Sequence, residues 1–133
     1  SSILENSLMI DLKKMQAGDY GLQNFALFTS LERAEGKPFE YCMGLLDTFY
    51  TEMEAHSDMI GIVRSYRDIE DNWRKGRMSA LLTIEEGGVC QGSLRFLRDF
   101  YRLGVRMMSW DFPTKGNGVR TEPRIWCRTN PMA

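Results

Sequence analysis

The pattern of apolar and polar residues predicts short strands that alternate with amphipathic helices. Four segments have the length and the continuous apolar character of buried strands: residues 22–28, 60–64, 78–84 and 105–110. Three segments place apolar residues at spacings of three and four, as helices do: residues 38–56, 68–75 and 94–103. Strands that are apolar on both faces and alternate with helices are typical of parallel βαβ units, so the pattern predicts an α/β fold.

Local signals place the ends and the buried faces of these helices. Pro38 suits a first helical turn, Ser93 suits an N-cap, and Gly76 and Gly104 each follow a predicted helix end. We expect the last helix to bury one apolar face, which consists of Leu94, Leu97, Phe100, Tyr101 and Leu103. In the helix over residues 68–75, we expect Ile69 and Trp73 to anchor the helix.

The composition changes near residue 110. Residues 1–110 carry 13 basic and 16 acidic side chains, whereas the last 23 residues carry four basic and two acidic ones, with three of the four prolines. This last part has neither helical nor strand periodicity. We therefore expect an α/β segment over residues 1–110 and an irregular tail over residues 111–133. A chain of 133 residues can bury one core and has no room for two full domains.

Charge and composition exclude several classes of protein. The formal net charge is −1, so no strong field favours nucleic acid or an anionic membrane as partner. No run of about 18 apolar residues could span a bilayer, and no signal peptide is visible. The three cysteines are far apart and form no C-x-x-C pair, which favours a reduced, cytoplasmic chain. His56 is the only histidine, which excludes an H-E-x-x-H site.

Candidate chemistry lies where predicted strands end, because functional groups of parallel α/β folds gather at the carboxyl ends of strands. These ends are Glu85-Glu86-Gly87-Gly88 and Ser109-Trp110-Asp111. Strand alternation sends the side chains of Glu85 and Glu86 to opposite faces, and the two glycines allow the backbone to turn sharply. A carboxylate here suits a metal ion or a general base. A plain polar strand end before a glycine turn is the alternative.

Three other features have a structural and a functional interpretation. His56 is either a cation near a helix end or a catalytic group, and no nucleophile lies near it in sequence. The basic stripe is either a solvated helix face or a phosphate site; it consists of Arg95, Arg98, Arg102 and Arg106. Trp73, Trp110 and Trp126 are not spaced as one stacking surface. No glycine-rich phosphate loop follows an early strand, so a flavodoxin-like nucleotide-binding module has little support.

Two blocks of the sequence resemble the membrane (renal-type) dipeptidase family, the zinc dipeptidases related to the amidohydrolases. Residues 81–110, LLTIEEGGVCQGSLRFLRDFYRLGVRMMSW, resemble its central segment: an apolar strand, Glu-Gly-Gly, a leucine-rich helix and Leu-Gly-Val-Arg before a further strand. Upstream, IDLKKMQAGDYGLQNFALF resembles a second family segment in the expected order and distance. The resemblance covers residues 8–112 and is closest to bacterial members, which also favours a cytoplasmic enzyme.

The resemblance implies a (β/α)8 TIM barrel with two zinc ions at the carboxyl ends of its strands. A water that bridges the two metal ions would attack the peptide carbonyl of a dipeptide substrate. One carboxylate bridges both metal ions, and the glutamate before Gly-Gly takes that role in the family. Glu86 matches this ligand, and Glu85 is then a neighbouring non-ligand. The resemblance assigns no catalytic residue or substrate-binding residue in this chain.

The sequence departs from the family pattern where other metal ligands are needed. The family's first strand carries a His-x-Asp pair that has no match here, and the strand over residues 107–112 is about two residues short and lacks a substrate-contacting histidine. A barrel needs about 250 residues, and a catalytic zinc ion usually needs three protein ligands. We therefore expect a partial barrel that is inactive alone. The alternative is a non-catalytic α/β fragment, a homo-oligomer that self-associates through open strand edges.

Overall fold

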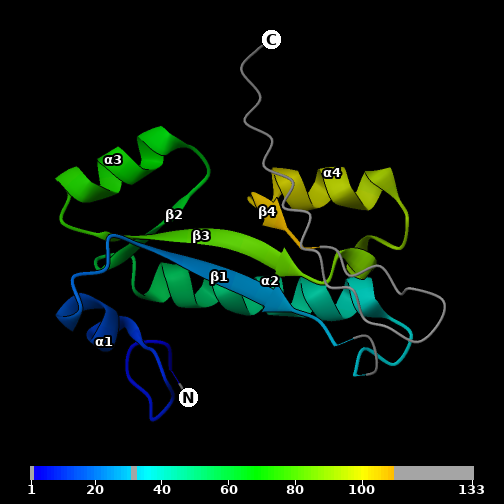
Figure 1. Cartoon of the computed structure of the whole chain (residues 1–133), viewed down its shortest axis with the longest axis horizontal. Helices are drawn as coiled ribbons and strands as arrows, with labels where there is room; N and C mark the ends of the chain where they lie inside the picture. Colours follow the sequence, from blue (N-terminus) through cyan, green and yellow to red (C-terminus); the bar gives the residue numbers. More distant parts are fainter. Residues whose placement is uncertain (1, 31–32, 110–133) are drawn as a thin grey trace, which may run out of the picture. The chain divides into compact units, whose positions relative to one another are not determined.

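The predicted alternation of strands and helices is present in the structure, a computed structural model that describes residues 2–30 and 33–109. The elements in chain order are α1 (Leu12–Ala17), β1 (Leu22–Phe28), α2 (Pro38–Ala55), β2 (Ile60–Val63), α3 (Tyr66–Arg74), β3 (Met78–Glu85), the 3₁₀ helix η1 (Gly87–Cys90), α4 (Leu94–Arg102) and β4 (Met107–Met108) (Figure 1). The predicted Ser93 cap and the helix ends before Gly76 and Gly104 are confirmed. Helix α1 was not predicted, because its six residues are too few to show a periodicity.

Parallel pairing organises the sheet around β3. The strand order is β1-β3-β2, and β4 also pairs with β3. Strand β2 runs parallel to β3 from Ile60↔Met78 to Val63↔Leu81, and β4 runs parallel to it at Thr83↔Met107 and Ile84↔Met108. Backbone hydrogen bonds run from Ser79 N to Gly21 O (2.9 Å) and from Thr29 N to Glu85 O (3.3 Å). Residue numbers therefore increase in the same direction along β1 and β3, so these two strands are also parallel. The predicted parallel α/β class is therefore confirmed.

The chain divides into two compact units. Unit 1 contains residues 1–25 and 45–81, and unit 2 contains residues 26–44 and 82–133. Strands β1 and β3 and helix α2 each run through both units. The backbone contacts that position the candidate site, described below, all lie within unit 2.

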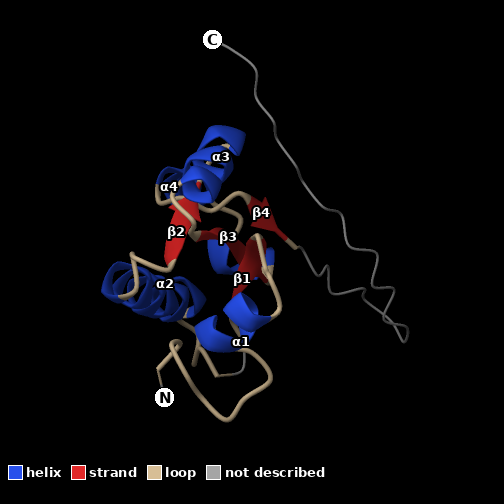
Figure 2. Ribbon diagram, turned by 90° about the vertical axis from the view of Figure 1, so that its left-hand side faces the viewer, coloured by secondary structure: helices blue, strands red, loops and turns tan. Residues whose placement is uncertain are grey.

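Unit 1 has an apolar core, which consists of Leu12, Met15, Leu46, Phe49, Met53, Ile60, Val63, Met78 and Ala80. Asp11 caps α1, since its Oδ1 accepts a hydrogen bond from Lys14 N at 2.8 Å. The side-chain hydrogen bond from Lys14 lowers the pKa of Asp11 to about 2. Helix α3 packs against β2 (Figure 2) and begins with a capping box, in which Ser65 and Asp68 each accept the other's backbone N–H.

A buried asparagine joins α3 to the strands at the amino end of β3. Asn72 is 3% exposed, and its Nδ2 donates hydrogen bonds to Gly61 O at 3.0 Å and to Ser79 Oγ at 3.2 Å. Arg77 Nη2 donates to Asn72 Oδ1 at 2.7 Å. A Cβ atom on Gly61 would lie 2.2 Å from Asn72 Oδ1, so this close approach requires glycine.

Unit 2 packs the first turn of α2 against α4. The Phe39 ring lies 4.1 Å from that of Phe96 and 5.4 Å from that of Phe100, measured between ring centroids. The other buried apolar residues of this unit are Leu27, Ala34, Cys42, Leu82, Ile84, Val89, Cys90 and Val105. The aromatic contacts fix the start of α2, and Leu27 of β1 with Leu82 and Ile84 of β3 belongs to the buried core of this unit.

The predicted burial of β1 and α4 is largely wrong. Leu22 and Phe28 of β1 are 39% and 58% exposed, and only Leu27 of this strand is buried, because Leu22 and Phe28 lie on the face of the strand that no described residue covers fully. Of the predicted face of α4, only Phe100 is buried. The other contact residue is Phe96, which the prediction left out. Apolar residues occur around much of α4, so their spacing did not single out the buried side.

Two further predictions need correction, and others fall outside the described residues. Trp73 is 74% exposed and is no anchor, since Asn72 is the residue of α3 that is buried. Strand β4 has two residues where six were predicted. Trp110, Cys127 and the predicted tail over residues 111–133 lie outside the described part of the chain. Over residues 2–30 and 33–109, no helix combines the length and the apolar character needed to cross a membrane.

Candidate functional site

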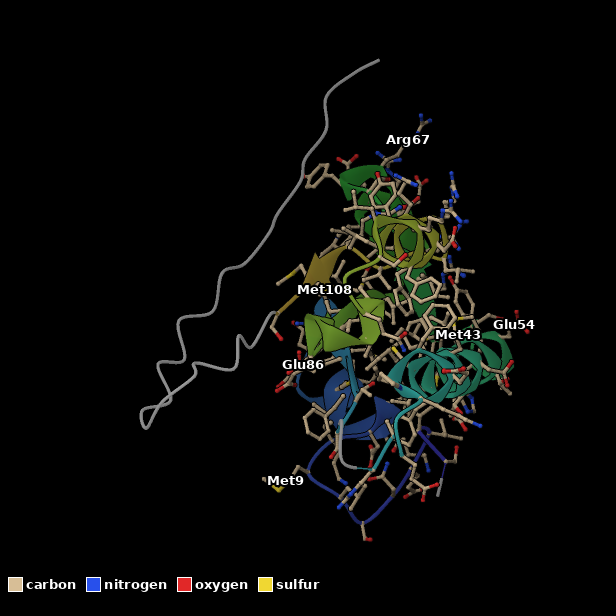
Figure 3. All side chains as sticks on the ribbon, turned by 90° about the vertical axis from the view of Figure 1, so that its right-hand side faces the viewer. Met9, Met43, Glu54, Arg67, Glu86 and Met108 are labelled. Atoms are coloured by element: carbon tan, nitrogen blue, oxygen red, sulfur yellow. The ribbon has the colours of Figure 1, made fainter. Side chains whose placement is uncertain are left out.

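The carboxyl ends of β1, β3 and β4 meet within unit 2. Thr29 N donates to Glu85 O at 3.3 Å, Ser109 N donates to Ile84 O at 3.0 Å, and Gly87 N donates to Ser109 O at 2.8 Å. Figure 3 looks toward these strand ends, with Glu86 and Met108 labelled. This edge is where ligands and catalytic groups of parallel α/β folds gather, and it brings together the two predicted groups that contain Glu86 and Ser109.

Glu86 occupies an unusual backbone conformation directly after β3. Its φ is 88° and its ψ is 91°, and it caps the 3₁₀ helix η1. A residue with a side chain pays about 1 kcal/mol or more to adopt positive φ. We expected the two glycines to supply the sharp turn, but the turn is made by Glu86 itself. Strained residues that the surrounding structure holds in place cluster at functional sites, which supports Glu86 as the candidate.

Hydrogen bonds orient the Glu86 turn. Glu86 Oε1 accepts from Gly88 N at 2.8 Å, and Glu86 N donates to Ser109 Oγ at 3.5 Å. A Cβ on Gly88 would lie 3.0 Å from Glu86 Oε1, so glycine permits this close approach. Glu86 is half-buried, whereas Glu85 is exposed. The half-buried carboxylate is therefore fixed within its own turn, and the neighbouring carboxylate lies in solvent.

Buried sulfur atoms lie next to this turn. Cys90 in η1 is 2% exposed, and its Sγ donates to Met108 Sδ at 3.9 Å. Burial and, to a smaller extent, the nearby Cys42 thiol together raise the pKa of the Cys90 thiol to about 11. Burial also raises the pKa of Cys42, and the Thr29 hydroxyl opposes this shift. Both cysteines are free thiols, and burial disfavours the thiolate form of each.

Thr29 is a further candidate at these strand ends that the sequence analysis missed. It follows the carboxyl end of β1 and is 1% exposed, and the Cys42 thiol, whose pKa the Thr29 hydroxyl lowers, is the one polar group that its Oγ1 meets within the described residues. Its position right after a strand is the same signal that pointed to Glu86 and Ser109. Applied to residues 22–28, that rule would have identified it.

The other sequence candidates have structural roles. His56 lies in unit 1 at the end of α2, its Nε2 is 3.9 Å from Glu52 Oε2, and its carbonyl accepts from Met59 N and Ile60 N. Arg102 pairs with Asp99 at 3.0 Å. Arg106 stacks over the Tyr101 ring at 4.3 Å and donates to the Tyr101 carbonyl. The basic stripe therefore forms a solvated, locally paired face.

The described residues do not form a complete metal centre. Across residues 2–30 and 33–109, no three His, Cys, Asp or Glu side chains gather closely enough to hold an ion. A catalytic zinc ion usually needs three protein ligands, and two zinc ions need more. Glu86 alone therefore does not fit a two-zinc centre, although its carboxylate suits one ligand position of such a centre.

Comparisons with known proteins match both the sequence and the fold. A model of the membrane dipeptidase family, peptidase family M19, matches residues 2–117. Dipeptidase verJ of Clonostachys rogersoniana is 31% identical over 67 residues, which make up 50% of this chain and 17% of that protein. The chain therefore spans about a sixth of this relative.

Solved structures resemble this chain over most of its length. The probable dipeptidase PvdM from Pseudomonas aeruginosa has a TM-score of 0.67 at 18% identity, over 82% of this chain and 30% of that one. A metallo peptidase from Rhodobacter sphaeroides, liganded with a phosphinate mimic of the dipeptide L-Ala-D-Ala, has a TM-score of 0.68 at 15% identity, over 78% and 36%. These neighbours are (β/α)8 barrels, so the described residues form part of such a barrel.

Proposed function

The chain belongs to the membrane dipeptidase family, peptidase family M19, and from this premise we propose that it forms part of the barrel of a zinc-dependent dipeptidase. The observation that carries the proposal is Glu86, held at positive φ where the carboxyl ends of β1, β3 and β4 meet. Glu86 is the proposed metal ligand, and the exposed Glu85 is a non-ligand neighbour. Dipeptides are the proposed substrate class, because verJ is a dipeptidase and the Rhodobacter enzyme holds a dipeptide mimic.

By itself, the chain is proposed to be inactive. Its described residues offer one suitable carboxylate, whereas a catalytic zinc ion usually needs three protein ligands. We assign no reaction step to this chain, since the missing ligands must come from outside the described residues. When bound by a full set of ligands, zinc polarises a carbonyl and activates water. We also propose a cytoplasmic location, supported by the two buried free thiols Cys42 and Cys90.

Zinc titration followed by amide NMR tests the role of Glu86. We expect weak zinc binding to shift the backbone amide signals of Glu86, Gly87 and Gly88, because they surround the carboxylate. The variant Glu86→Gln keeps an acceptor for Gly88 N but should lose these shifts. The matched variant Glu85→Gln should keep them. Equal shifts in the Glu86→Gln variant and the unmodified chain would remove Glu86 from the site.

A dipeptide hydrolysis assay tests the proposed inactivity. With zinc present, the chain alone should release amino acids from alanyl-alanine no faster than buffer does. Turnover that disappears in Glu86→Gln would contradict the proposed inactivity and would retain Glu86 as a site residue.

A second candidate function is self-association without catalysis. It is favoured by the exposed apolar side chains of β1, Leu22 and Phe28. Exposed strand edges pair readily with other chains, so a homo-oligomer remains our proposal for the assembly.

A further inference from the structure

The carboxyl end of β1 has one face toward the helices and one face toward the inside of the barrel. Leu27 and Thr29 are buried, and the Thr29 hydroxyl contacts the Cys42 thiol of α2. Helices surround the strands in a (β/α)8 barrel, so the face toward α2 is the outer face. Alternate residues of a strand point to opposite faces, so Phe28 points to the inner face.

Phe28, Glu85 and Ser109 lie side by side on this inner face. Thr29 N donates to Glu85 O, which in a parallel ladder sets Phe28 opposite Glu85, and the bond between the other ends of β1 and β3 gives the same register. The register of β4 on β3, extended by one residue, sets Ser109 opposite Glu85. Opposite residues of parallel strands point to the same face, and the strands are about 4.8 Å apart. One aromatic ring, one carboxylate and one hydroxyl therefore form a row across the inner face.

Glu85 is the charged residue of this row. Its side chain is exposed, and within residues 2–30 and 33–109 it forms no ion pair. An ionised carboxylate inside a barrel is costly unless a cation or hydrogen-bond donors meet it. A carboxylate next to an aromatic ring suits an ammonium group, because the carboxylate accepts a charge-assisted hydrogen bond and the ring attracts the cation.

The proposed metal ligand is the next residue along β3. Strand alternation alone would send the Glu86 side chain to the outer face, but its φ of 88° ends the alternation there. In Figure 3 the Glu86 side chain projects away from α4, which belongs to the outer layer of a barrel. The Glu85 and Glu86 carboxylates therefore both face the inside of the barrel at its carboxyl end, where substrates of such folds bind.

We propose that Glu85 is a substrate-binding residue, whose carboxylate binds an ammonium group of the dipeptide next to the Phe28 ring. The inference rests on the proposed dipeptidase function and adds a substrate contact to it. Two groups have this chemistry: the α-ammonium of any dipeptide and the side-chain ammonium of a lysyl residue. Glu85 thus contacts substrate, whereas Glu86 contacts metal.

Dipeptide binding to the chain without zinc, followed by amide NMR, tests this role. We expect alanyl-alanine to shift the amide signals of Phe28, Glu85 and Ser109, with a dissociation constant of about 10 mM because the contacts are few. Glu85→Gln should weaken this binding about fivefold, since it removes the charge. The control Glu54→Gln removes an exposed carboxylate from α2 and should leave binding unchanged. Equal affinity of Glu85→Gln and the unmodified chain would overturn the proposal.

Two acetylated dipeptides identify which ammonium group binds. N-acetyl-alanyl-alanine has no ammonium group and should cause no shifts, so binding as tight as that of alanyl-alanine would overturn the proposal. N-acetyl-alanyl-lysine has only the side-chain ammonium. Shifts that it causes, and that Glu85→Gln weakens, would assign the contact to a basic side chain; shifts from alanyl-alanine alone would assign it to the α-ammonium. No shifts from any of these dipeptides would overturn the proposal.

Failure of this inference can be told apart from failure of the dipeptidase proposal. The dipeptide experiment contains no zinc and follows Phe28, Glu85 and Ser109. The zinc titration contains no dipeptide and follows the amide signals of Glu86 and the glycines after it. A lost zinc response with intact dipeptide shifts would contradict only the metal role of Glu86, and the reverse result would contradict only the substrate role of Glu85.

Discussion

The two ends of β3 are built in different ways. At the amino end, in unit 1, the Asn72 side chain fills the space above Gly61 and makes three hydrogen bonds of 2.7 to 3.2 Å. At the carboxyl end, in unit 2, Glu86 adopts a φ of 88° and its side chain bonds to its own turn. The amino end therefore stabilises the fold, whereas the positive φ of Glu86 at the carboxyl end costs stability and places one carboxylate. Barrel folds show the same division between the two ends of their strands.

Gly61→Ala should have the largest effect on stability, because it disrupts the packing of Asn72 at the amino end of β3. The new Cβ would lie 2.2 Å from Asn72 Oδ1, and Asn72 cannot move without losing buried hydrogen bonds. We expect a loss of about 3 kcal/mol in the free energy of unfolding, measured in urea. Gly44→Ala is the control, since its Cβ meets nothing within 4 Å and alanine favours a helix. A loss below about 0.5 kcal/mol in Gly61→Ala would contradict this account.

The reactivity of the Cys90 thiol tests whether η1, at the carboxyl end of β3, is packed as the structure shows. Burial raises its pKa from 9.0 to about 11, so its thiolate fraction at pH 8 should fall about 100-fold. Alkylation by iodoacetamide should therefore be at least about 100-fold slower in the native chain than in urea, as followed by peptide mass spectrometry. Equal rates in the native and unfolded chain would show that η1 does not bury this thiol.

Ser65→Ala should lower the free energy of unfolding by a smaller amount, through unit 1, which contains the amino end of β3. Ser65 Oγ accepts from Asp68 N at 3.4 Å, and Asp68 Oδ2 accepts from Ser65 N at 2.8 Å. Loss of the capping side chain should cost about 1 kcal/mol in the free energy of unfolding. Ser57→Ala, at an exposed position after α2, should change it by less than about 0.5 kcal/mol. Equal effects of the two substitutions would mean that the cap contributes nothing.

Glu86→Gln should have the smallest effect on stability. Glutamine keeps the Oε1 that accepts from Gly88 N, and the backbone conformation is unchanged. We expect the free energy of unfolding to stay within about 0.5 kcal/mol of the unmodified value. A loss above about 2 kcal/mol would mean that the carboxylate stabilises the fold, contrary to its proposed role.

The positions of strands and helices could be predicted because the hydrophobic period reflects burial along each element. The burial of β1 could not, since a strand's own residues do not show whether both of its faces are covered. The strand order had no signal either: β2 follows β1 in sequence, yet β1 pairs with β3. Each strand is a short apolar run, and such a run can pair with any of several other strands.

The candidate site was predictable in residue type but not in geometry. Glu86 was found from its place after an apolar strand and from the family resemblance. The sharp turn was expected at the two glycines, because glycine adopts positive φ freely and glutamate seldom does, whereas Glu86 itself has the positive φ. The Asn72 contacts had no signal, since one polar residue in a charged helix does not stand out as buried. Long-range hydrogen bonds of this kind depend on the assembled fold.

Zinc stoichiometry tests the central claim most directly. The claim is that this chain is part of a dipeptidase barrel and contributes one metal ligand, Glu86. The chain would be loaded with zinc, dialysed exhaustively and measured by plasma mass spectrometry. We predict fewer than about one zinc ion per chain, because a single carboxylate cannot retain the metal. About two zinc ions per chain would contradict the account, because the chain would then hold a complete two-metal centre.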